Sequence, residues 1–255
     1  MFNLKDKKAY ITGGSGGIGR AVAELMIAHG AQVVIADIND PTSVAADIGA
    51  VPLQCDVADE NSVQQSLVAA EQAVGKLDVV VLNAGIGDVG PEIASLDQAL
   101  LERVTRVNYW GVLYGMKHAP AVMADGGSII CTSSMAAFIN LPGGAAYSAS
   151  KRAIISLAEM SALELGQRNI RVNCVCPGYT DTAMGSGDEG RKICEAFTAL
   201  GRVADVDDIS GVFLFLASDA SRYMTGQALK VDGGWSCGPT TKLLEMVTGA
   251  GHAPS

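Results

Sequence analysis

Lys8-Ala-Tyr-Ile-Thr12, followed directly by Gly13-Gly-Ser-Gly-Gly-Ile-Gly19, is the stretch that decides the fold of this chain. The first five residues are rich in side chains that favour a β-strand. Behind the glycines, apolar residues recur at helical spacing, at Ile18, Val22, Leu25 and Met26, until Gly30 ends the pattern. The stretch therefore predicts a strand, a tight glycine-rich turn and a helix in direct succession.

The same alternation of strand and helix continues along the chain. Further strands are expected at 32–36, 51–55, 78–82, 128–132, 171–175 and 228–231, and helices at about 60–74, 95–119, 147–167 and 206–217. The strand at 78–82 is apolar throughout, which indicates burial on both faces, as in a parallel sheet. This order predicts an α/β protein with one doubly wound parallel sheet and helices on both faces.

The chain shows no internal repeat or linker, so residues 1–235 are expected to form one domain. Two stretches break the alternation. Residues 184–200 are expected to be an insertion that forms a small substrate lobe, with Gly185 and Gly187 as hinges of a lid. Residues 236–255 read as a C-terminal tail with a short helix at about 243–247, and we expect this tail to cross to a neighbouring subunit.

Composition narrows the range of partners and compartments. A net charge of −9 argues against nucleic acids and anionic membranes. No apolar run is long enough to span a membrane. The N-terminus leads straight into a strand without a signal-peptide core, which predicts a cytoplasmic protein. The 6 cysteines include no Cys-x-x-Cys pair, so buried thiols in a reducing compartment are favoured over a metal site or disulfides.

The glycine-rich turn and the end of the second strand predict a dinucleotide site. Glycines between a strand and a helix let the backbone approach a pyrophosphate, which then lies at the helix N-terminus. Asp37 lies where an acid accepts hydrogen bonds from the adenosine ribose and repels a 2′-phosphate, and Ile38 follows it in place of a basic residue. NAD is therefore favoured over NADP. The alternative is that Asp37 is a solvated acid at a strand end. The residues predicted here are Gly13, Ser15, Gly17, Ile18, Gly19, Asp37 and Ile38.

Tyr147 and Lys151 share one face of the helix expected at 147–167 because they are four residues apart. A free tyrosine has a pKa of about 10, so a base at neutral pH needs a shift of about three units, or roughly 4 kcal/mol. Two unit charges about 4 Å apart contribute roughly that much at an effective dielectric of 20. Lys151 and a cationic cofactor could together supply the shift. The alternative is an ordinary pair of surface neighbours.

Further short motifs follow one another in a fixed order. They are Thr12-Gly13 with Gly17-Ile18-Gly19, Asp56-Val57, Asn83-Ala84-Gly85, Asn108, Ser134 placed 13 residues before Tyr147, Pro177-Gly178 with Thr180 and Thr182, and Asp232-Gly233-Gly234. Taken in this order, the motifs resemble the short-chain dehydrogenase/reductase family over residues 6–235. Ser133 also precedes Tyr147, but the spacing selects Ser134 as the match to the family's serine.

The resemblance implies a single Rossmann-like domain with about seven strands in the order 3-2-1-4-5-6-7. It also implies a catalytic tetrad. Ser134 and Tyr147 would hydrogen-bond the substrate oxygen, Lys151 would lower the pKa of Tyr147 and hold the nicotinamide ribose, and Asn108 would position a water. Asp56, Val57, Asn83, Ala84, Gly85, Tyr147, Lys151, Pro177, Gly178, Thr180 and Thr182 are implied to bind NAD. The family usually forms homotetramers.

The substrate is expected beyond the fifth and sixth strands, because ligands bind at the carboxyl ends of strands in such sheets. Candidate substrate residues are Met135, Phe138, Gly144, Tyr179 and Met184, with Ala136, Gly143 and Phe197 nearby. Packing is the alternative for each. Few aromatic residues are available, so no strongly stacking pocket is obvious. Arg191 and Lys192 could hold an anionic group, but a solvated charged face is favoured.

The preferred function is an NAD-dependent dehydrogenase that acts on a small-molecule secondary alcohol or the corresponding ketone. A 3-oxoacyl thioester or carbonyl reductase that uses NADPH is the main alternative. It is disfavoured because no basic residue lies in the glycine turn before Arg20. A non-catalytic nucleotide sensor is disfavoured because such proteins typically lose the tyrosine or the lysine. The sequence does not separate steroid or polyol substrates from other secondary alcohols.

Overall fold

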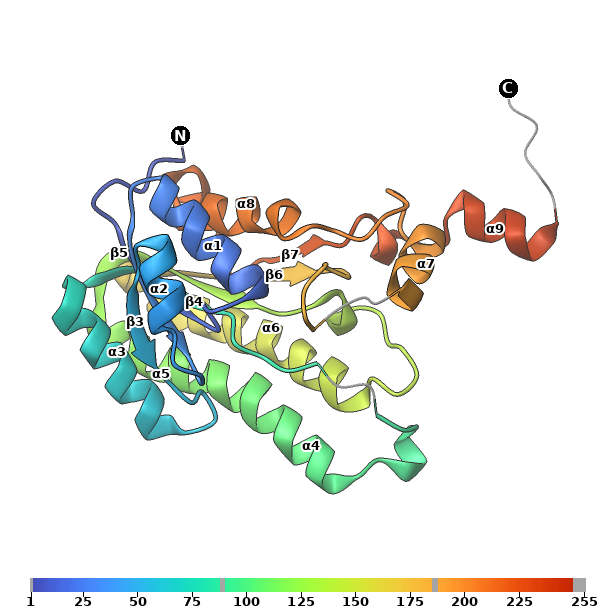
Figure 1. Ribbon diagram of the computed structural model, residues 1–255, viewed down its shortest axis with the longest axis horizontal. Coiled ribbons are helices and arrows are strands. Elements are labelled where there is room, and N and C mark those ends of the chain that lie inside the picture. Colours follow the sequence, from blue (N-terminus) through green and yellow to red (C-terminus); the bar gives the residue numbers. More distant parts are fainter. Residues whose placement is uncertain (1, 88–89, 185–187, 250–255) are drawn as a thin grey trace.

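The computed structural model describes residues 2–87, 90–184 and 188–249. Its centre is a parallel sheet of seven strands in the order β3-β2-β1-β4-β5-β6-β7, which confirms the predicted fold class and strand order (Figure 1). The strands are β1 (Lys8–Thr12), β2 (Gln32–Asp37), β3 (Val51–Gln54), β4 (Leu77–Leu82), β5 (Met123–Thr132), β6 (Arg171–Pro177) and β7 (Ala228–Val231). All of the strand pairs are parallel, so the carboxyl ends of all seven strands lie along one edge.

Helices cover both faces of the sheet. They are α1 (Gly17–Ala28), α2 (Thr42–Ile48), α3 (Glu60–Val74), α4 (Gln98–Thr105), α5 (Gly111–Val122), α6 (Ala145–Leu165), α7 (Asp188–Phe197), α8 (Val206–Ala217) and α9 (Thr241–Thr248). One hydrophobic core lies under α3, α5 and α6, and a second core lies under α1, α2 and α8. Strand β4 serves both cores, because Val80 faces the first while Val79 and Val81 face the second. This burial on two faces explains its continuous apolar sequence.

The long helix expected at about 95–119 differs from the observed one. A short 3₁₀ turn, Ile93–Ser95, precedes it, and α4 begins only at Gln98, where the Asp97 side chain accepts a hydrogen bond from the Ala99 amide. A π-helical segment at Arg106–Trp110 then joins α4 to α5. Periodicity does not reveal this segment, because a single wide turn leaves the apolar pattern on both sides nearly unchanged.

The sequence-based prediction also lacked helix α2 and began strand β5 too late. Helix α2 was not predicted, since only its Ala45 is buried and its apolar pattern is correspondingly weak. Strand β5 was expected to begin at Ser128, because Gly126 and Gly127 suggest a turn. It begins at Met123, which pairs with Leu77 across a register irregularity.

The expected insertion and tail pack on each other. Helix α7 lies in the stretch predicted as the substrate lobe, and α9 includes the predicted short helix (Figure 1). The Thr240 hydroxyl donates to the Ala196 carbonyl, and Lys242 lies 3.8 Å from Glu195. The described part of the tail therefore contacts helix α7 of its own chain. Gly185 and Gly187, on which the expectation of a lid depends, lie outside the described residues.

Candidate active site

Asn83 ties together the carboxyl ends of three strands. The side-chain nitrogen of Asn83 donates to the carbonyls of Thr12 (3.2 Å) and Gly13 (3.3 Å). Its side-chain oxygen accepts a hydrogen bond from the Thr132 hydroxyl (3.0 Å). The Thr12 hydroxyl in turn accepts hydrogen bonds from the backbone amides of Asn83 (3.0 Å) and Ala84 (3.1 Å). These bonds fix the loops after β1, β4 and β5 relative to one another, so a site at this edge rests on a rigid base.

The glycine-rich turn leaves no room for side chains where it folds back on itself. Gly13 has a φ of +66°, and a Cβ there would lie 3.0 Å from the Ala84 Cα. A Cβ at Gly19 would collide with the Gly13 carbonyl. By contrast, a Cβ at Gly16 would meet nothing within 4 Å, so the backbone there is open to a ligand at the N-terminus of α1.

Asp37 contacts the same turn. Its carboxylate accepts a hydrogen bond from the Ser15 amide (3.2 Å) and another from the Asn39 amide (3.3 Å). The Ser15 hydroxyl is buried and has no hydrogen-bond partner among the described residues. Ile38, which follows Asp37 in the chain, is 59% exposed. An unpaired hydroxyl, open backbone amides and a nearby acid fit the pyrophosphate and ribose of a dinucleotide.

The catalytic candidates of α6 and β5 meet at the end of the sheet. Lys151 is buried, and its ammonium donates to the Thr132 carbonyl (3.0 Å). The Lys151 Nζ also lies 5.6 Å from the centre of the Tyr147 ring. Ser134 lies two residues after the end of β5, at the start of a short 3₁₀ turn, Met135–Ala137, and faces the phenol of Tyr147. The pair predicted from helical spacing therefore lies at one edge of the sheet, with Lys151 buried and Tyr147 partly exposed.

Burial dominates the electrostatics of this pair. It raises the pKa of the Tyr147 phenol above its ordinary value, and a hydrogen bond with Ser134 offsets part of that shift. The same burial lowers the pKa of Lys151 to about 8. Desolvation disfavours the charged form of both groups and so opposes the decrease in the Tyr147 pKa that Coulomb's law alone predicts. In the free chain Tyr147 is thus protonated at neutral pH, and a further positive charge is needed to ionise it.

Asn108 lies in the π-helical segment and is fully buried. Its side chain bonds both backbone groups of Ile86, accepting from the amide (2.8 Å) and donating to the carbonyl (3.0 Å). It also donates to the Ser150 hydroxyl (3.2 Å), which donates to the Tyr147 carbonyl (2.7 Å). The widened helix turn therefore links the loop after β4 to the helix that carries Tyr147.

A cavity of about 730 Å³ runs along these groups. It brings together most of the predicted site residues: Gly17, Ile18, Asn83, Gly85, Ser134, Met135, Gly144, Tyr147, Lys151, Pro177, Gly178, Tyr179, Thr180, Thr182 and Met184. Other predicted cofactor residues are not part of its lining, namely Gly13, Ser15, Gly19, Asp37, Ile38, Asp56, Val57 and Ala84. Of these, Asp37 ends β2, and Asp56 and Val57 follow β3.

Two further predicted residues do not line the cavity. Asn108 is buried behind it, and Phe138 packs against the core with the Lys230 ammonium 4.5 Å from its ring centre. The cavity also has a wall that sequence reasoning missed, formed by Leu141, Pro142, Ser148 and Ala183. Leu141 and Pro142 lie in the segment between β5 and α6, so the rule that ligands bind beyond the carboxyl ends of strands could have found them.

An aromatic stack supports the substrate end of the cavity. Trp235 lies between Tyr179, whose ring centre is 5.5 Å away, and Phe197, whose ring centre is 5.3 Å away. Of the three rings, only Tyr179 lines the cavity. Although the sequence holds few aromatic residues and makes no strongly stacking pocket obvious, the fold collects three of these rings into one stack. The role of Trp235 was missed since it follows the last strand, far from Tyr179 in sequence.

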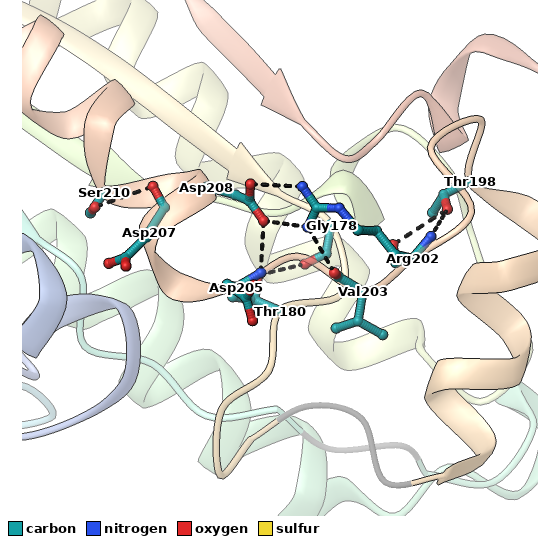
Figure 2. A network of polar contacts seen from close by, with 9 residues as sticks. All are labelled: Gly178, Thr180, Thr198, Arg202, Val203, Asp205, Asp207, Asp208 and Ser210. Atoms are coloured by element: carbon teal, nitrogen blue, oxygen red, sulfur yellow. Dashed lines mark hydrogen bonds and ion pairs between the residues drawn. The ribbon is translucent and has the colours of Figure 1, made fainter.

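A polar network lies beside the part of the cavity wall that includes Gly178 and Thr180 (Figure 2). Arg202 makes a two-pronged ion pair with Asp208, with distances of 2.6 and 2.8 Å, and Asp208 also accepts from the Asp205 amide at the start of α8. The loop between them pairs with the cavity wall, because the Ala204 amide donates to the Tyr179 carbonyl (3.1 Å). The ion pair thus fixes the loop on which Tyr179 rests.

The ion pair makes an acid-sensitive contribution to stability. The hydrogen bond from Arg202, followed by that from the Asp205 backbone, lowers the pKa of Asp208 from 3.8 to about 2. Since the pKa is depressed on folding, the contribution is present above about pH 4 and is lost as the pH falls towards 2. The pair is exposed, so its effect is small. We expect Asp208→Asn to lower the melting temperature by about 1–3 °C at pH 7.

The measurement is thermal unfolding at a series of pH values. The difference between wild type and Asp208→Asn should vanish near pH 2. Asp207→Asn, a change in the same helical turn, is the control and should have a smaller effect at pH 7. A difference that persists unchanged at pH 2 would contradict the assigned ion pair.

Within residues 2–87, 90–184 and 188–249, no helix is long and apolar enough to cross a membrane. The same ranges hold no cluster of three or more histidine, cysteine, aspartate or glutamate side chains suited to a metal ion. Arg191, one of the basic residues considered for an anionic substrate, pairs with Asp181 (2.6 Å) and does not line the cavity.

Known proteins are similar to this chain in sequence and in fold. A family described as Enoyl-(Acyl carrier protein) reductase matches residues 13–236. Secoisolariciresinol dehydrogenase from Forsythia intermedia is 39% identical, over 95% of this chain and 94% of its own length. Borneol dehydrogenase, mitochondrial, from Lavandula x intermedia is 40% identical, over 91% of this chain and 92% of its own length.

A solved structure of a short-chain dehydrogenase/reductase from Serratia marcescens superposes with a TM-score of 0.87 at 33% identity, covering 91% of this chain and 99% of that one. A ligand-free aldohexose dehydrogenase from Thermoplasma acidophilum gives a TM-score of 0.85 at 31% identity, covering 92% and 96%. The matched regions include the glycine-rich turn, the seven-stranded sheet and the helix that carries Tyr147 and Lys151. The chain belongs to the short-chain dehydrogenase/reductase family of oxidoreductases, whose members use nicotinamide cofactors.

Proposed function

We propose that this protein is an NAD-dependent dehydrogenase that interconverts a secondary alcohol and its ketone, with Tyr147 as general acid and base. The observation that carries the proposal is that one cavity is lined by Ser134, Tyr147 and Lys151 together with the N-terminus of α1. One cavity thus brings together a proton-transfer group, its partners and the glycine turn that would hold a dinucleotide.

In the proposed reaction, the substrate oxygen lies between the Ser134 hydroxyl and the Tyr147 phenol. Bound NAD supplies the acceptor of the hydride and a positive charge near the phenol. Tyr147 takes the hydroxyl proton during oxidation and returns it during reduction. The Lys151 ammonium, anchored on the Thr132 carbonyl, favours the phenolate. Asn108 and Ser150 hold the helix so that the phenol keeps its position.

Asp37 supports NAD over NADP. The carboxylate lies beside the Ser15 amide at the end of β2, where it can accept hydrogen bonds from ribose hydroxyls and would repel a 2′-phosphate. The exposed neighbour is Ile38, which offers no positive charge for such a phosphate. We therefore infer that NADH binds more tightly than NADPH.

The cavity wall favours a neutral, apolar substrate. Beyond Tyr147 it is formed by Met135, Leu141, Pro142, Tyr179 and Met184, and Lys151 is the one charged side chain in the described lining. That lysine is committed to the Thr132 carbonyl. The names of two relatives, which specify borneol and secoisolariciresinol, fit a bulky apolar alcohol. A carrier-bound acyl thioester, suggested by the description of the matching family, is the second candidate.

We also propose a homotetramer in the cytoplasm. Trp110, which directly precedes α5, and Met160 and Leu163 of α6 are exposed apolar side chains that a second subunit would cover. The six cysteines are free thiols, which suits a reducing compartment. Light scattering on the purified protein tests the assembly; a monomer would exclude this part of the proposal.

The deciding experiment is a fluorescence titration with NADH and with NADPH, followed by turnover with a panel of secondary alcohols and a 3-oxoacyl thioester. Tighter binding of NADH and oxidation of bulky alcohols such as borneol are expected. Tighter binding of NADPH together with reduction of the thioester would move the reductase into first place. Cofactor binding without turnover of any compound would point to a nucleotide sensor.

A further inference from the structure

Two consecutive residues, the last of β5 and the one that follows it, bind Lys151 at its ammonium and at its backbone carbonyl. The Thr132 carbonyl accepts a hydrogen bond from the Lys151 ammonium (3.0 Å), and the next residue, Ser133, donates its hydroxyl to the Lys151 backbone carbonyl (2.7 Å). Ser133 is itself fixed, since it is 2% exposed and its amide donates to the Val175 carbonyl of β6 (2.8 Å). Helix α6 is therefore hydrogen-bonded to the carboxyl end of β5 and to the following residue at the position of Lys151.

The bond from Ser133 adds to the hydrogen bonds of the helix. A carbonyl oxygen has two lone pairs, so the Lys151 carbonyl can accept from Ser133 as well as from its own helix. Removing the Ser133 hydroxyl therefore leaves no buried carbonyl without a partner. The bond therefore adds a direct contact between α6 and the residue that follows β5.

We propose that Ser133 is a positioning residue for the reaction, which acts by fixing where the Lys151 ammonium lies relative to the Tyr147 phenol and the cofactor. A lysine side chain has four flexible carbons, and burial has already lowered the pKa of Lys151 to about 8. The ammonium therefore needs its hydrogen bond to the Thr132 carbonyl to remain charged and to lie close to the Tyr147 phenol. This proposal rests on the proposed function for its turnover readout, and it assigns work to a serine other than Ser134.

The same strand supplies a matched control. Ser128 is buried at 1% exposure, and its hydroxyl donates to the Leu216 carbonyl of α8 (2.9 Å). This is also a bond from a buried serine to a helix carbonyl, but Ser128 lies within β5, five residues before Ser133, and faces the opposite side of the sheet. Ser128→Ala therefore reproduces the structural loss of Ser133→Ala without touching Lys151.

The experiment compares wild type with Ser133→Ala, Ser133→Thr and Ser128→Ala in melting temperature, NADH affinity, KM and kcat. Both alanine variants should lose similar amounts of thermal stability. Only Ser133→Ala should lower kcat, by about 10- to 100-fold, because a misplacement of about 1 Å can cost a factor of that size. Its pH profile for oxidation should move upward by about one unit as the phenolate loses support. Ser133→Thr keeps the hydroxyl and should restore most of kcat.

Distinct outcomes separate this proposal from the proposed function. Equal losses of kcat in Ser133→Ala and Ser128→Ala, or an unchanged pH profile, would overturn the positioning role while leaving the dehydrogenase intact. If wild type oxidises no alcohol, the proposed function fails, and NADH affinity decides the role of Ser133. Weaker NADH binding in Ser133→Ala alone would then support it, and unchanged binding would exclude it. Absence of NADH binding by wild type would overturn both proposals.

Discussion

Tyr147→Phe is expected to reduce kcat by about a thousandfold while NADH still binds with wild-type affinity. Proton transfer by a positioned side chain contributes roughly 100- to 10,000-fold. The substitution removes only the phenolic oxygen, and the ring remains to fill the cavity beside Lys151. The measurement is steady-state turnover of the best alcohol from the panel, together with a fluorescence titration of NADH.

Tyr179→Phe is the matched control for that variant. Tyr179 lines the same cavity and its ring stacks on Trp235, so its phenylalanine variant also loses a hydroxyl but keeps the stack. It should keep most of its turnover. If Tyr147→Phe retained wild-type kcat, or if the two variants lost equal activity, Tyr147 could not be the acid and base.

Asp37→Asn is expected to reverse or abolish the preference for NADH. A hydrogen bond to a charged group contributes about 1.5–3 kcal/mol, so NADH should bind about 10- to 100-fold more weakly. NADPH should bind more tightly than to wild type, because the repulsion of its 2′-phosphate is removed. Asparagine is of similar size and keeps one oxygen that can accept the hydrogen bond from Ser15.

Asp40→Asn controls for the loss of one charge. Asp40 is exposed three residues further on, where its carboxylate accepts from the Thr42 amide (3.0 Å). Its variant should leave the ratio of NADH to NADPH affinity unchanged. An equal change of the ratio in both variants would mean that net charge, and no local contact of Asp37, determines the preference.

Much of the fold could be read from local patterns. Helix α8 and strand β7 begin and end where the apolar patterns predicted, because an unbroken amphipathic or apolar run reports its own periodicity. The π-helical segment that carries Asn108 could not be found in this way. Its Asn108 bonds Ile86, a residue 22 positions away, and such a contact is absent from any local pattern.

The sequence by itself determined the fold class, the family and the set of motifs, since strand, glycine turn, acid and Tyr147–Lys151 spacing are all local signals. Only the tertiary structure decided that Lys151 is buried and bonded to Thr132, that Tyr147 has a raised pKa, and that Ser133 grips α6. It also decided that Trp235 supports Tyr179 and that Phe138 lies outside the cavity. The physical reason is that desolvation and packing depend on neighbours that are distant along the chain, which spacing along a single strand or helix cannot reveal.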